Sequence, residues 1–216
     1  NNRLGVPQTV FRLNAKHQGA VIEMGVDNVG QTTRLCEVAD PTIGIITNIG
    51  PDHLEFFGSM DVSAQAKAEL LDCLPPNGTA ILNADDSFYD YLAARARCRV
   101  VSFGLSAKAD VRAMDVTTDK GNGTIFHLLL PGHVRRTTVH VRVQGEHNVA
   151  NALAAAAVGT VLGLSGSAIA RGLSKFRPAA MRSQVSVYRG VKLIIDCYNA
   201  NPASMTAAVQ LLAQVK

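Results

Sequence analysis

A group of polar side chains opens an alanine-rich helical pattern in this sequence. The segment G-E-H-N-V-A-N-A occupies residues 145–152, and a run of alanine, leucine and valine follows it. Asn148 and Asn151 are three residues apart and therefore share a helix face, where their amides can offer donors and acceptors to a flat polar ring. The simpler interpretation, in which Asn148 only caps the helix, stays open.

Four further positions bear on a possible metal site. Glu23 and Asn48 come at the ends of apolar segments that resemble strands, and ligands of open α/β sheets bind at that edge. A carboxylate there could bind Mg²⁺ through oxygen, although Glu23 could also cap a helix or form a surface ion pair. His53 follows the second apolar segment, and imidazole is a common metal ligand, but a solvated or capping histidine is the alternative. Lys67 lies on the next helical pattern and carries little information alone.

One more candidate lies near the end of the chain. Asp196 ends the last apolar segment, where its carboxylate could accept hydrogen bonds from ribose hydroxyls. The same carboxylate could equally cap the helix that is expected after Pro202.

Alternating strands and helices must position these residues. The first half of the sequence predicts buried parallel strands at 20–24, 42–48, 79–83 and 99–103, and helices at 31–38, 62–74 and 87–97. Residues 111–116, 124–130 and 137–143 alternate polar with apolar side chains and predict a small antiparallel meander. Helices are expected at 147–162 and 166–176. We therefore expect an α/β fold with a mainly parallel sheet flanked by helices.

The pattern of predicted elements changes near Pro178. A strand pair at 185–188 and 191–196, followed by a helix from residue 203, indicates the first β-α unit of a further, Rossmann-like domain. We expect a central domain at residues 1–180 and the start of a C-terminal domain at 181–216.

The composition and charge of the chain argue against several classes of protein. The chain has 216 residues, is 47% hydrophobic and carries a net charge of +4, but its basic residues are scattered and aromatic residues are only 5%. We therefore expect no nucleic-acid partner. No apolar run is long enough to span a membrane. Four widely spaced cysteines predict buried, reduced thiols and a cytoplasmic protein. The sequence also lacks the G-x-x-x-x-G-K-[ST] loop that cradles nucleotide phosphates.

Several segments, in order, carry a resemblance to a known family. They are N-N-R-L-G-V-P at the start, I-E-M-G around Glu23, T-N-I-G-P-D-H-L-E around His53, A-K-A-E around Lys67, G-E-H-N-V-A-N-A-L and D-C-Y-N-A-N-P. Together they resemble the Mur ligases, ATP-dependent amino-acid ligases of cell-wall synthesis. The first and last of these segments point to the branch of the family that adds D-alanyl-D-alanine.

The resemblance implies roles for individual residues. Glu23 and His53 would bind Mg²⁺, and Lys67 would be carbamylated by CO₂ into a carboxylate-like metal ligand. These three residues would form the catalytic centre. Further roles fall on the nucleotide and the substrate: Asn148 and Asn151 would face adenine, Arg182 would face the phosphates, Asp196 and Asn199 would complete the nucleotide site, and Asn1 and Asn2 would bind substrate.

The same resemblance implies a P-loop-type central domain whose phosphate loop lies before Asn1. The substrates would be ATP, UDP-N-acetylmuramoyl-tripeptide and D-alanyl-D-alanine, and the protein would be a monomer. Three other interpretations stay open: a sister ligase, a polymer synthetase built on the same core, and a non-catalytic nucleotide- or protein-binding module without a phosphate loop.

Overall fold

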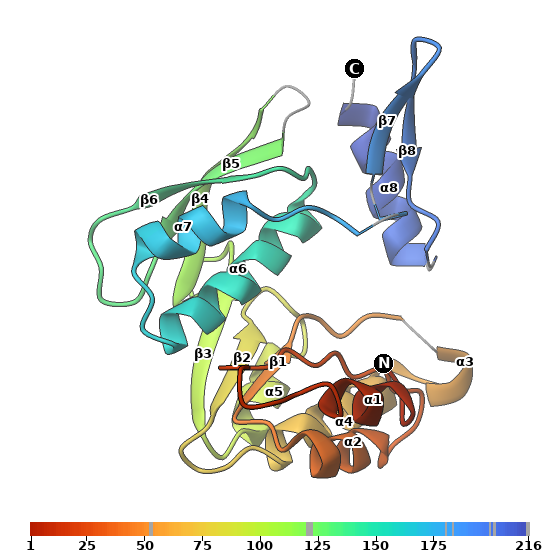
Figure 1. Cartoon of the computed structure of the whole chain (residues 1–216), viewed down its shortest axis with the longest axis vertical. Coiled ribbons are helices and arrows are strands. Elements are labelled where there is room, and N and C mark those ends of the chain that lie inside the picture. Colours follow the sequence, from red (N-terminus) through yellow and green to blue (C-terminus); the bar gives the residue numbers. More distant parts are fainter. Residues whose placement is uncertain are drawn as a thin grey trace. The chain divides into compact units, whose positions relative to one another are not determined.

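The structure is a computed structural model that describes residues 1–51, 54–119, 123–179, 181–182, 184–198, 200 and 202–214. Strands of this part of the chain form a six-stranded sheet in the order β1-β2-β3-β4-β5-β6 and a separate two-stranded hairpin, β7-β8 (Figure 1). The strands are β1 (Ile43–Ile46), β2 (Thr79–Asn83), β3 (Arg99–Gly104), β4 (Val111–Asp119), β5 (Gly123–Leu129), β6 (Thr137–Val141), β7 (Gln184–Tyr188) and β8 (Val191–Ile195).

The direction of the strands changes along the sheet as the sequence predicts. β1 pairs with β2, and β3 with β4, in parallel, whereas β4, β5 and β6 pair antiparallel. The helices are α1 (Gly5–Val10), α2 (Gln31–Ala39), α3 (Leu54–Phe57), α4 (Met60–Asp72), α5 (Tyr89–Arg95), α6 (Glu146–Val161), α7 (Gly166–Ser174) and α8 (Pro202–Gln214). The α/β class with an antiparallel meander is confirmed.

One predicted strand is wrong. Residues 20–24 belong to no strand, and Val21 is 93% exposed. An apolar run becomes a strand only when a neighbour satisfies its backbone N–H and C=O groups. β1 lies at the end of the strand order, and no described strand pairs with its outer edge. Glu23 is therefore not positioned by the end of a strand.

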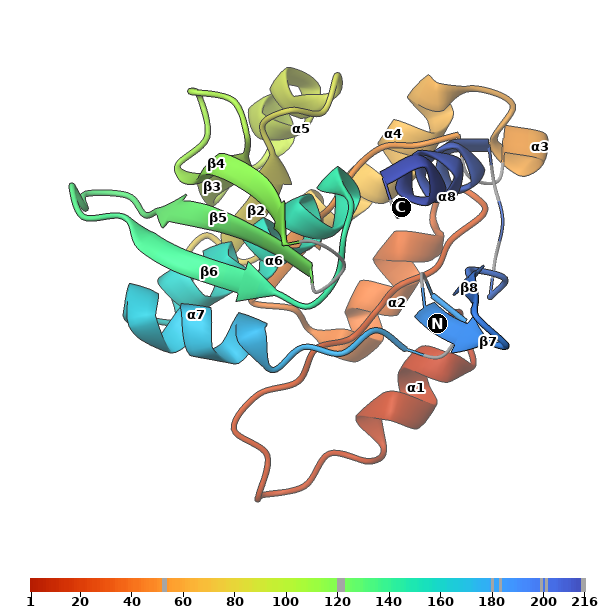
Figure 2. The same cartoon turned by 90° about the horizontal axis from the view of Figure 1, so that it is seen from above.

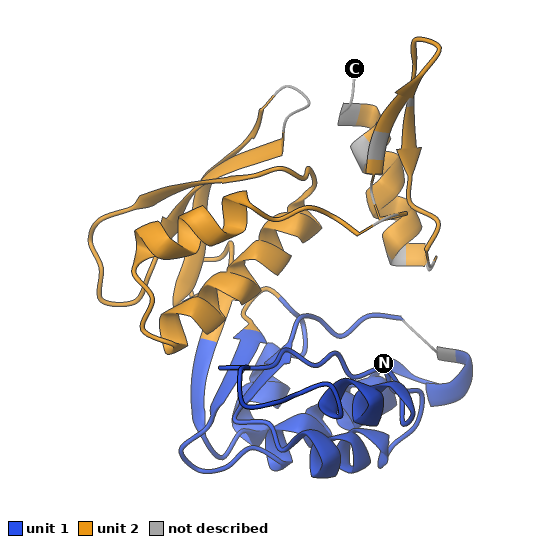
Figure 3. Ribbon diagram, viewed as in Figure 1, with its two compact units in different colours: residues 1–82, 86–101 blue, residues 83–85, 102–216 orange. Residues whose placement is uncertain are grey.

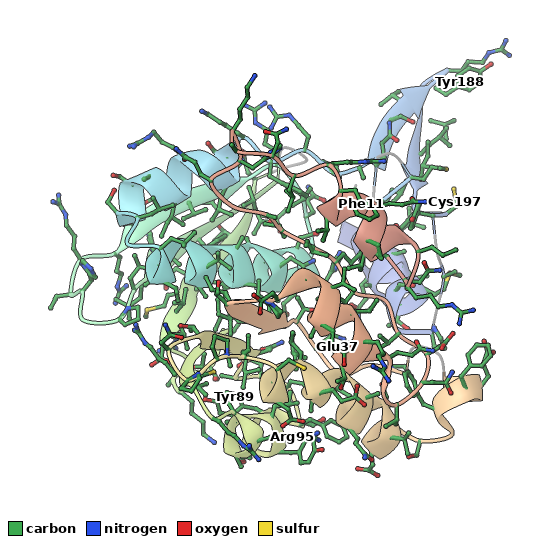
Figure 4. The ribbon with its side chains drawn as sticks, turned by 60° about the horizontal axis from the view of Figure 1, so that its bottom comes forward. Phe11, Glu37, Tyr89, Arg95, Tyr188 and Cys197 are labelled. Atoms are coloured by element: carbon green, nitrogen blue, oxygen red, sulfur yellow. The ribbon has the colours of Figure 1, made fainter. Side chains whose placement is uncertain are left out.

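The chain divides into two compact units (Figure 3). Unit 1 comprises residues 1–82 and 86–101, and its core joins β1 and β2 to α4 and α5 through buried side chains. Leu71 and Leu82 are fully buried there, and burial of one such leucine contributes roughly 1.5–3 kcal/mol. Arg95 on α5, labelled in Figure 4, donates through Nε to Asp72 on α4 at 3.1 Å. This bond joins the two helices at the surface.

Unit 2 comprises residues 83–85 and 102–216. Its helix α6 is rich in alanine, which favours the helix intrinsically, and buried positions such as Val149, Leu153 and Ala157 hold it against neighbouring elements. Ser165 caps the start of α7, and its hydroxyl accepts from the Ala168 N–H. Two views show α6 and α7 beside β4, β5 and β6 (Figures 1 and 2). This arrangement brings the start of α6 to the end of the meander.

Two other expectations concern the whole chain. All four cysteines are free, as expected, but only Cys36 is fully buried, and Cys197 is exposed because it lies in the loop after β8. Within the described ranges, no helix is both long and apolar enough to cross a membrane.

Candidate functional site

The first predicted metal ligand, Glu23, lies beside the first residue of the chain. Asn1 Nδ2 donates to Glu23 Oε2 at 3.1 Å, and the Gly25 N–H donates to the Asn1 carbonyl at 2.8 Å. The Glu23 side chain is 75% exposed, and no hydrogen bond from the described residues reaches its Oε1. An exposed carboxylate with an open oxygen suits a hard cation such as Mg²⁺.

Asn2 has a local role as well as its predicted one. Its Oδ1 accepts from the N–H groups of Leu4 at 3.0 Å and Gly5 at 3.3 Å, at the start of α1. This oxygen is therefore occupied within the chain, and the amide nitrogen is the part of Asn2 that could contact a substrate.

The structure describes only part of the predicted cluster of Glu23, His53 and Lys67. His53 lies outside the described residues, and Lys67 is half-buried on α4. No three His, Cys, Asp or Glu side chains among the described residues gather as a metal-binding group. The three-residue metal site therefore stays a prediction.

Glu69, two residues beyond Lys67, has a structural role that the sequence did not reveal. Its buried carboxylate accepts from the Gly30 N–H and from the Thr33 N–H and hydroxyl, the last two at 3.1 Å each. The first N–H groups of a helix lack partners within the helix, and a carboxylate there also suits the helix dipole. Glu69 therefore fastens the start of α2 to α4 and is not free to bind a metal.

Asp86 is a second residue that sequence reasoning missed. Its Oδ2 accepts from the Ile49 N–H at 2.7 Å, and its Oδ1 accepts from the Phe88 N–H at 2.8 Å. Asp86 thus holds the loop that follows β1 and leads toward residue 53. The signal available in the sequence was N-A-D-D-S directly after the β2 segment, which is typical of a side chain that bonds to nearby backbone.

The other candidate centre is the start of α6. Gly145 has φ of +98°, and a Cβ at this position would lie 2.7 Å from Cε1 of His147. Glycine is therefore required for the imidazole to fold back over the backbone. Asn148 Nδ2 donates to the Gln144 carbonyl at 2.7 Å and approaches His147 Nε2 at 3.0 Å.

A cavity of about 550 Å³ lies along α6 and α7 and against β6. Asn148 and Asn151 both line it, so the predicted common face of the two amides faces one hollow. Apart from these amides and Lys175, its lining side chains are apolar or absent: Val141, Val143, Ala152, Ala155, Gly159, Leu164, Ala168, Ile169, Gly172, Leu173 and Phe176. An apolar hollow with a few polar groups is typical of small-molecule sites.

Residues from the last part of the chain contribute to this region. Burial lowers the pKa of His147 below its ordinary value of 6.5, and the Asp196 carboxylate opposes that shift. The guanidinium of Arg182 lies 4.3 Å from the centre of the Tyr198 ring. The Cys197 and Tyr198 N–H groups donate to the Met181 carbonyl at 3.1 and 3.2 Å. Arg182 is thus held beside the segment that contains Asp196, while Asn199 lies outside the described residues.

Comparison with known proteins identifies the family of the chain. A family model described as "Mur ligase middle domain" matches residues 1–159. The chain is 39% identical over its whole length to the UDP-N-acetylmuramoyl-tripeptide--D-alanyl-D-alanine ligase of Mycobacterium tuberculosis (strain H37Rv), of which it covers 42%. It is 36% identical to the ligase of that name from Escherichia coli (strain K12), of which it covers 48%.

Solved structures give the same result. The crystal structure of MurF from Acinetobacter baumannii superposes with a TM-score of 0.93 at 35% identity, over 99% of this chain and 46% of that one. MurF ligase from Thermotoga maritima in complex with ADP has a TM-score of 0.77 at 22% identity, a likeness of fold. The chain therefore spans less than half the length of these relatives.

Proposed function

The chain belongs to the Mur ligase middle-domain family, and we propose that its protein is an ATP-dependent ligase that joins D-alanyl-D-alanine to UDP-N-acetylmuramoyl-tripeptide. The names of its relatives support this reaction. The motifs at residues 1–7 and 196–202 support the D-alanyl-D-alanine-adding branch over its sister ligases.

The observation that carries the proposal is the cavity beside the start of α6. Asn148 and Asn151 line it, and their amides can exchange hydrogen bonds with the edge of adenine while the apolar lining contacts its faces. Arg182 would bind the phosphates of ATP as a charged hydrogen-bond donor, and Asp196 would accept from the ribose. Asn199 would complete this nucleotide site, and Asn1 and Asn2 would contact the substrate.

The proposed reaction proceeds in two steps. The terminal carboxylate of the tripeptide attacks the γ-phosphorus of ATP, which forms an acyl phosphate and releases ADP. The amine of D-alanyl-D-alanine then attacks the acyl carbon, loses a proton and displaces inorganic phosphate as the amide forms. No covalent nucleophile of the protein is needed, so the chain contributes orientation and charge.

Glu23, His53 and Lys67 would hold Mg²⁺ for this reaction, with Lys67 carbamylated so that an ammonium becomes an oxygen ligand. When bound, Mg²⁺ would offset negative charge on the phosphates and the carboxylate. The exposed carboxylate of Glu23 fits this role.

We also propose that residues 1–180 belong to the central domain and 181–216 to a C-terminal domain. In the relatives, more than half of the length lies outside the part that this chain matches. A monomeric, cytoplasmic enzyme is part of the same proposal, and the four free thiols are consistent with a reducing compartment.

An assay of phosphate release by the full-length protein tests the reaction. We expect release only when ATP, UDP-N-acetylmuramoyl-tripeptide and D-alanyl-D-alanine are present together. Equal release with a single amino acid in place of the dipeptide would assign the protein to a sister ligase. Release that needs no peptide acceptor at all would contradict a ligase of this type.

A further inference from the structure

The amide nitrogen of Asn148 contacts two atoms inside the chain. Nδ2 donates to the Gln144 carbonyl at 2.7 Å and lies 3.0 Å from His147 Nε2. A backbone carbonyl can only accept, so this contact alone determines which end of the amide is nitrogen. The Oδ1 atom accepts no hydrogen bond from the described residues, and it is the part of the amide left for a ligand in the cavity.

The imidazole is built to accept from this amide. The Gly145 backbone leaves room for the ring, because any Cβ there would collide with Cε1 and Nδ1 of His147. If Nε2 accepts, then Nδ1 carries the proton and the ring is neutral. Burial favours the same neutral form, since it lowers the pKa of His147. The Asp196 carboxylate, from the loop after β8, opposes this shift, and Glu146 precedes His147 on α6.

We propose that His147 is a positioning residue that, together with the Gln144 carbonyl, holds Asn148 with Oδ1 toward the ligand and thereby selects a 6-aminopurine. This inference rests on the proposed nucleotide site and adds a reason for its choice of base. The 6-amino group of adenine donates to Oδ1, whereas the 6-oxo group of hypoxanthine or guanine would place two acceptors face to face. A site that leaves a buried polar group unpaired rejects the wrong ligand strongly.

Kinetics of the full-length protein with ATP and inosine triphosphate (ITP) test this role. We expect the wild type to have a kcat/KM for ATP at least about tenfold above that for ITP, because a tenfold ratio corresponds to the free energy of roughly one hydrogen bond. His147→Phe keeps a ring over Gly145 but removes the acceptor. It should lower the ATP/ITP ratio about three- to tenfold, mainly through KM.

Two further variants make the result specific. His147→Gln supplies a side-chain oxygen that can accept from Asn148, so it should recover part of the ATP/ITP ratio. His133→Phe makes the same substitution in an exposed turn before β6 and should leave the ratio unchanged. Retained thermal unfolding midpoints in all variants would show that the fold is intact. If His147→Phe does not fold, His147→Gln is compared with His147→Ala. A higher ATP/ITP ratio in His147→Gln would support the positioning role, and equal ratios would contradict it.

The outcomes separate this inference from the proposed function. A wild type that uses ATP and discriminates against ITP, with a ratio unchanged in His147→Phe, would overturn the positioning role alone. A wild type that binds neither nucleotide would overturn the proposed nucleotide site and the positioning role with it. A ratio that falls in His147→Phe and recovers in His147→Gln would support the inference.

Discussion

In the proposed site, the orientation of the Asn148 side-chain amide depends on whether His147, at the start of α6, is protonated. The neutral imidazole of His147 can accept from Asn148 Nδ2, whereas the protonated ring presents N–H groups at both nitrogens and repels that donor. Because partial burial lowers the pKa of His147, the neutral form persists at pH 7 and is lost only as the pH falls through that lowered pKa. The amide should therefore be well oriented at neutral pH and poorly oriented in mild acid.

This dependence predicts a change in base selectivity with pH. The ratio of kcat/KM for ATP to that for ITP should be constant above pH 6.5 and should fall several-fold as pH drops through the lowered pKa of His147. Because ATP and ITP carry the same triphosphate, the ratio of their kcat/KM values cancels the effect of phosphate titration. The matched measurement is the same pH series in His147→Gln, whose ratio should be flat. A wild-type ratio that does not change down to pH 5 would contradict the assignment.

Lys67 gives a second prediction at this scale. If it is carbamylated and binds a metal, Lys67→Ala in the full-length protein should lower kcat by about 100-fold or more, as expected for the loss of a metal ligand. A short carboxylic acid such as acetate should restore part of that activity, because it supplies the missing oxygen. Lys108→Ala, at an exposed position, is the control. Normal turnover in Lys67→Ala would remove Lys67 from the site.

Some of these residues could be assigned from the sequence, and others could not. The spacing of Asn148 and Asn151 was enough to predict a common face, and both line one cavity. The use of the Asn148 nitrogen by Gln144 and His147 depends on a backbone turn at Gly145, which spacing does not encode. Glu69 was equally hidden, because its partners lie 36 and 39 residues away in the sequence.

At the scale of elements, α2 and α4 are joined through Glu69. Its buried carboxylate accepts from the Gly30 N–H and from the N–H and hydroxyl of Thr33, so Glu69→Ala removes the acceptor of all three donors at the start of α2. We expect a loss of about 1–3 kcal/mol in the free energy of unfolding, measured by urea denaturation. Glu37→Ala, which removes only an exposed pair with Arg34, should cost under about 0.5 kcal/mol. Equal effects of the two changes would contradict the capping role.

The failed strand at residues 20–24 shows where local pattern stops being informative. Short apolar runs at Thr79–Asn83 and Arg99–Gly104 became strands, and the run at 20–24 did not, although all three look alike in the sequence. The difference is a neighbouring strand, because backbone groups of an extended segment need a partner to form a ladder. Such a partner is a property of topology, and a local window cannot reveal it.

At the scale of the whole molecule, the β7-β8 hairpin differs from the main sheet. It has two strands, and several of its large apolar side chains face solvent: Val187 and Val191 are 66% and 59% exposed. In the main sheet, by contrast, Phe126 of β5 is fully buried and has strands on both sides. An isolated hairpin is only marginally stable in water. The proposed C-terminal domain would cover these exposed apolar side chains.

Hydrogen exchange measures this difference directly. In the 216-residue chain, amides of β7 and β8 should exchange at least about a hundredfold faster than those of β5, because opening the hairpin exposes little buried surface. In the full-length protein, the proposed C-terminal domain should cover Val187 and Val191 and slow exchange across the hairpin, while β5 stays as it was. Hairpin amides that are as protected as β5 in the short chain would show that residues 181–216 need no further chain for their stability, and the proposed domain boundary near residue 180 would then be wrong.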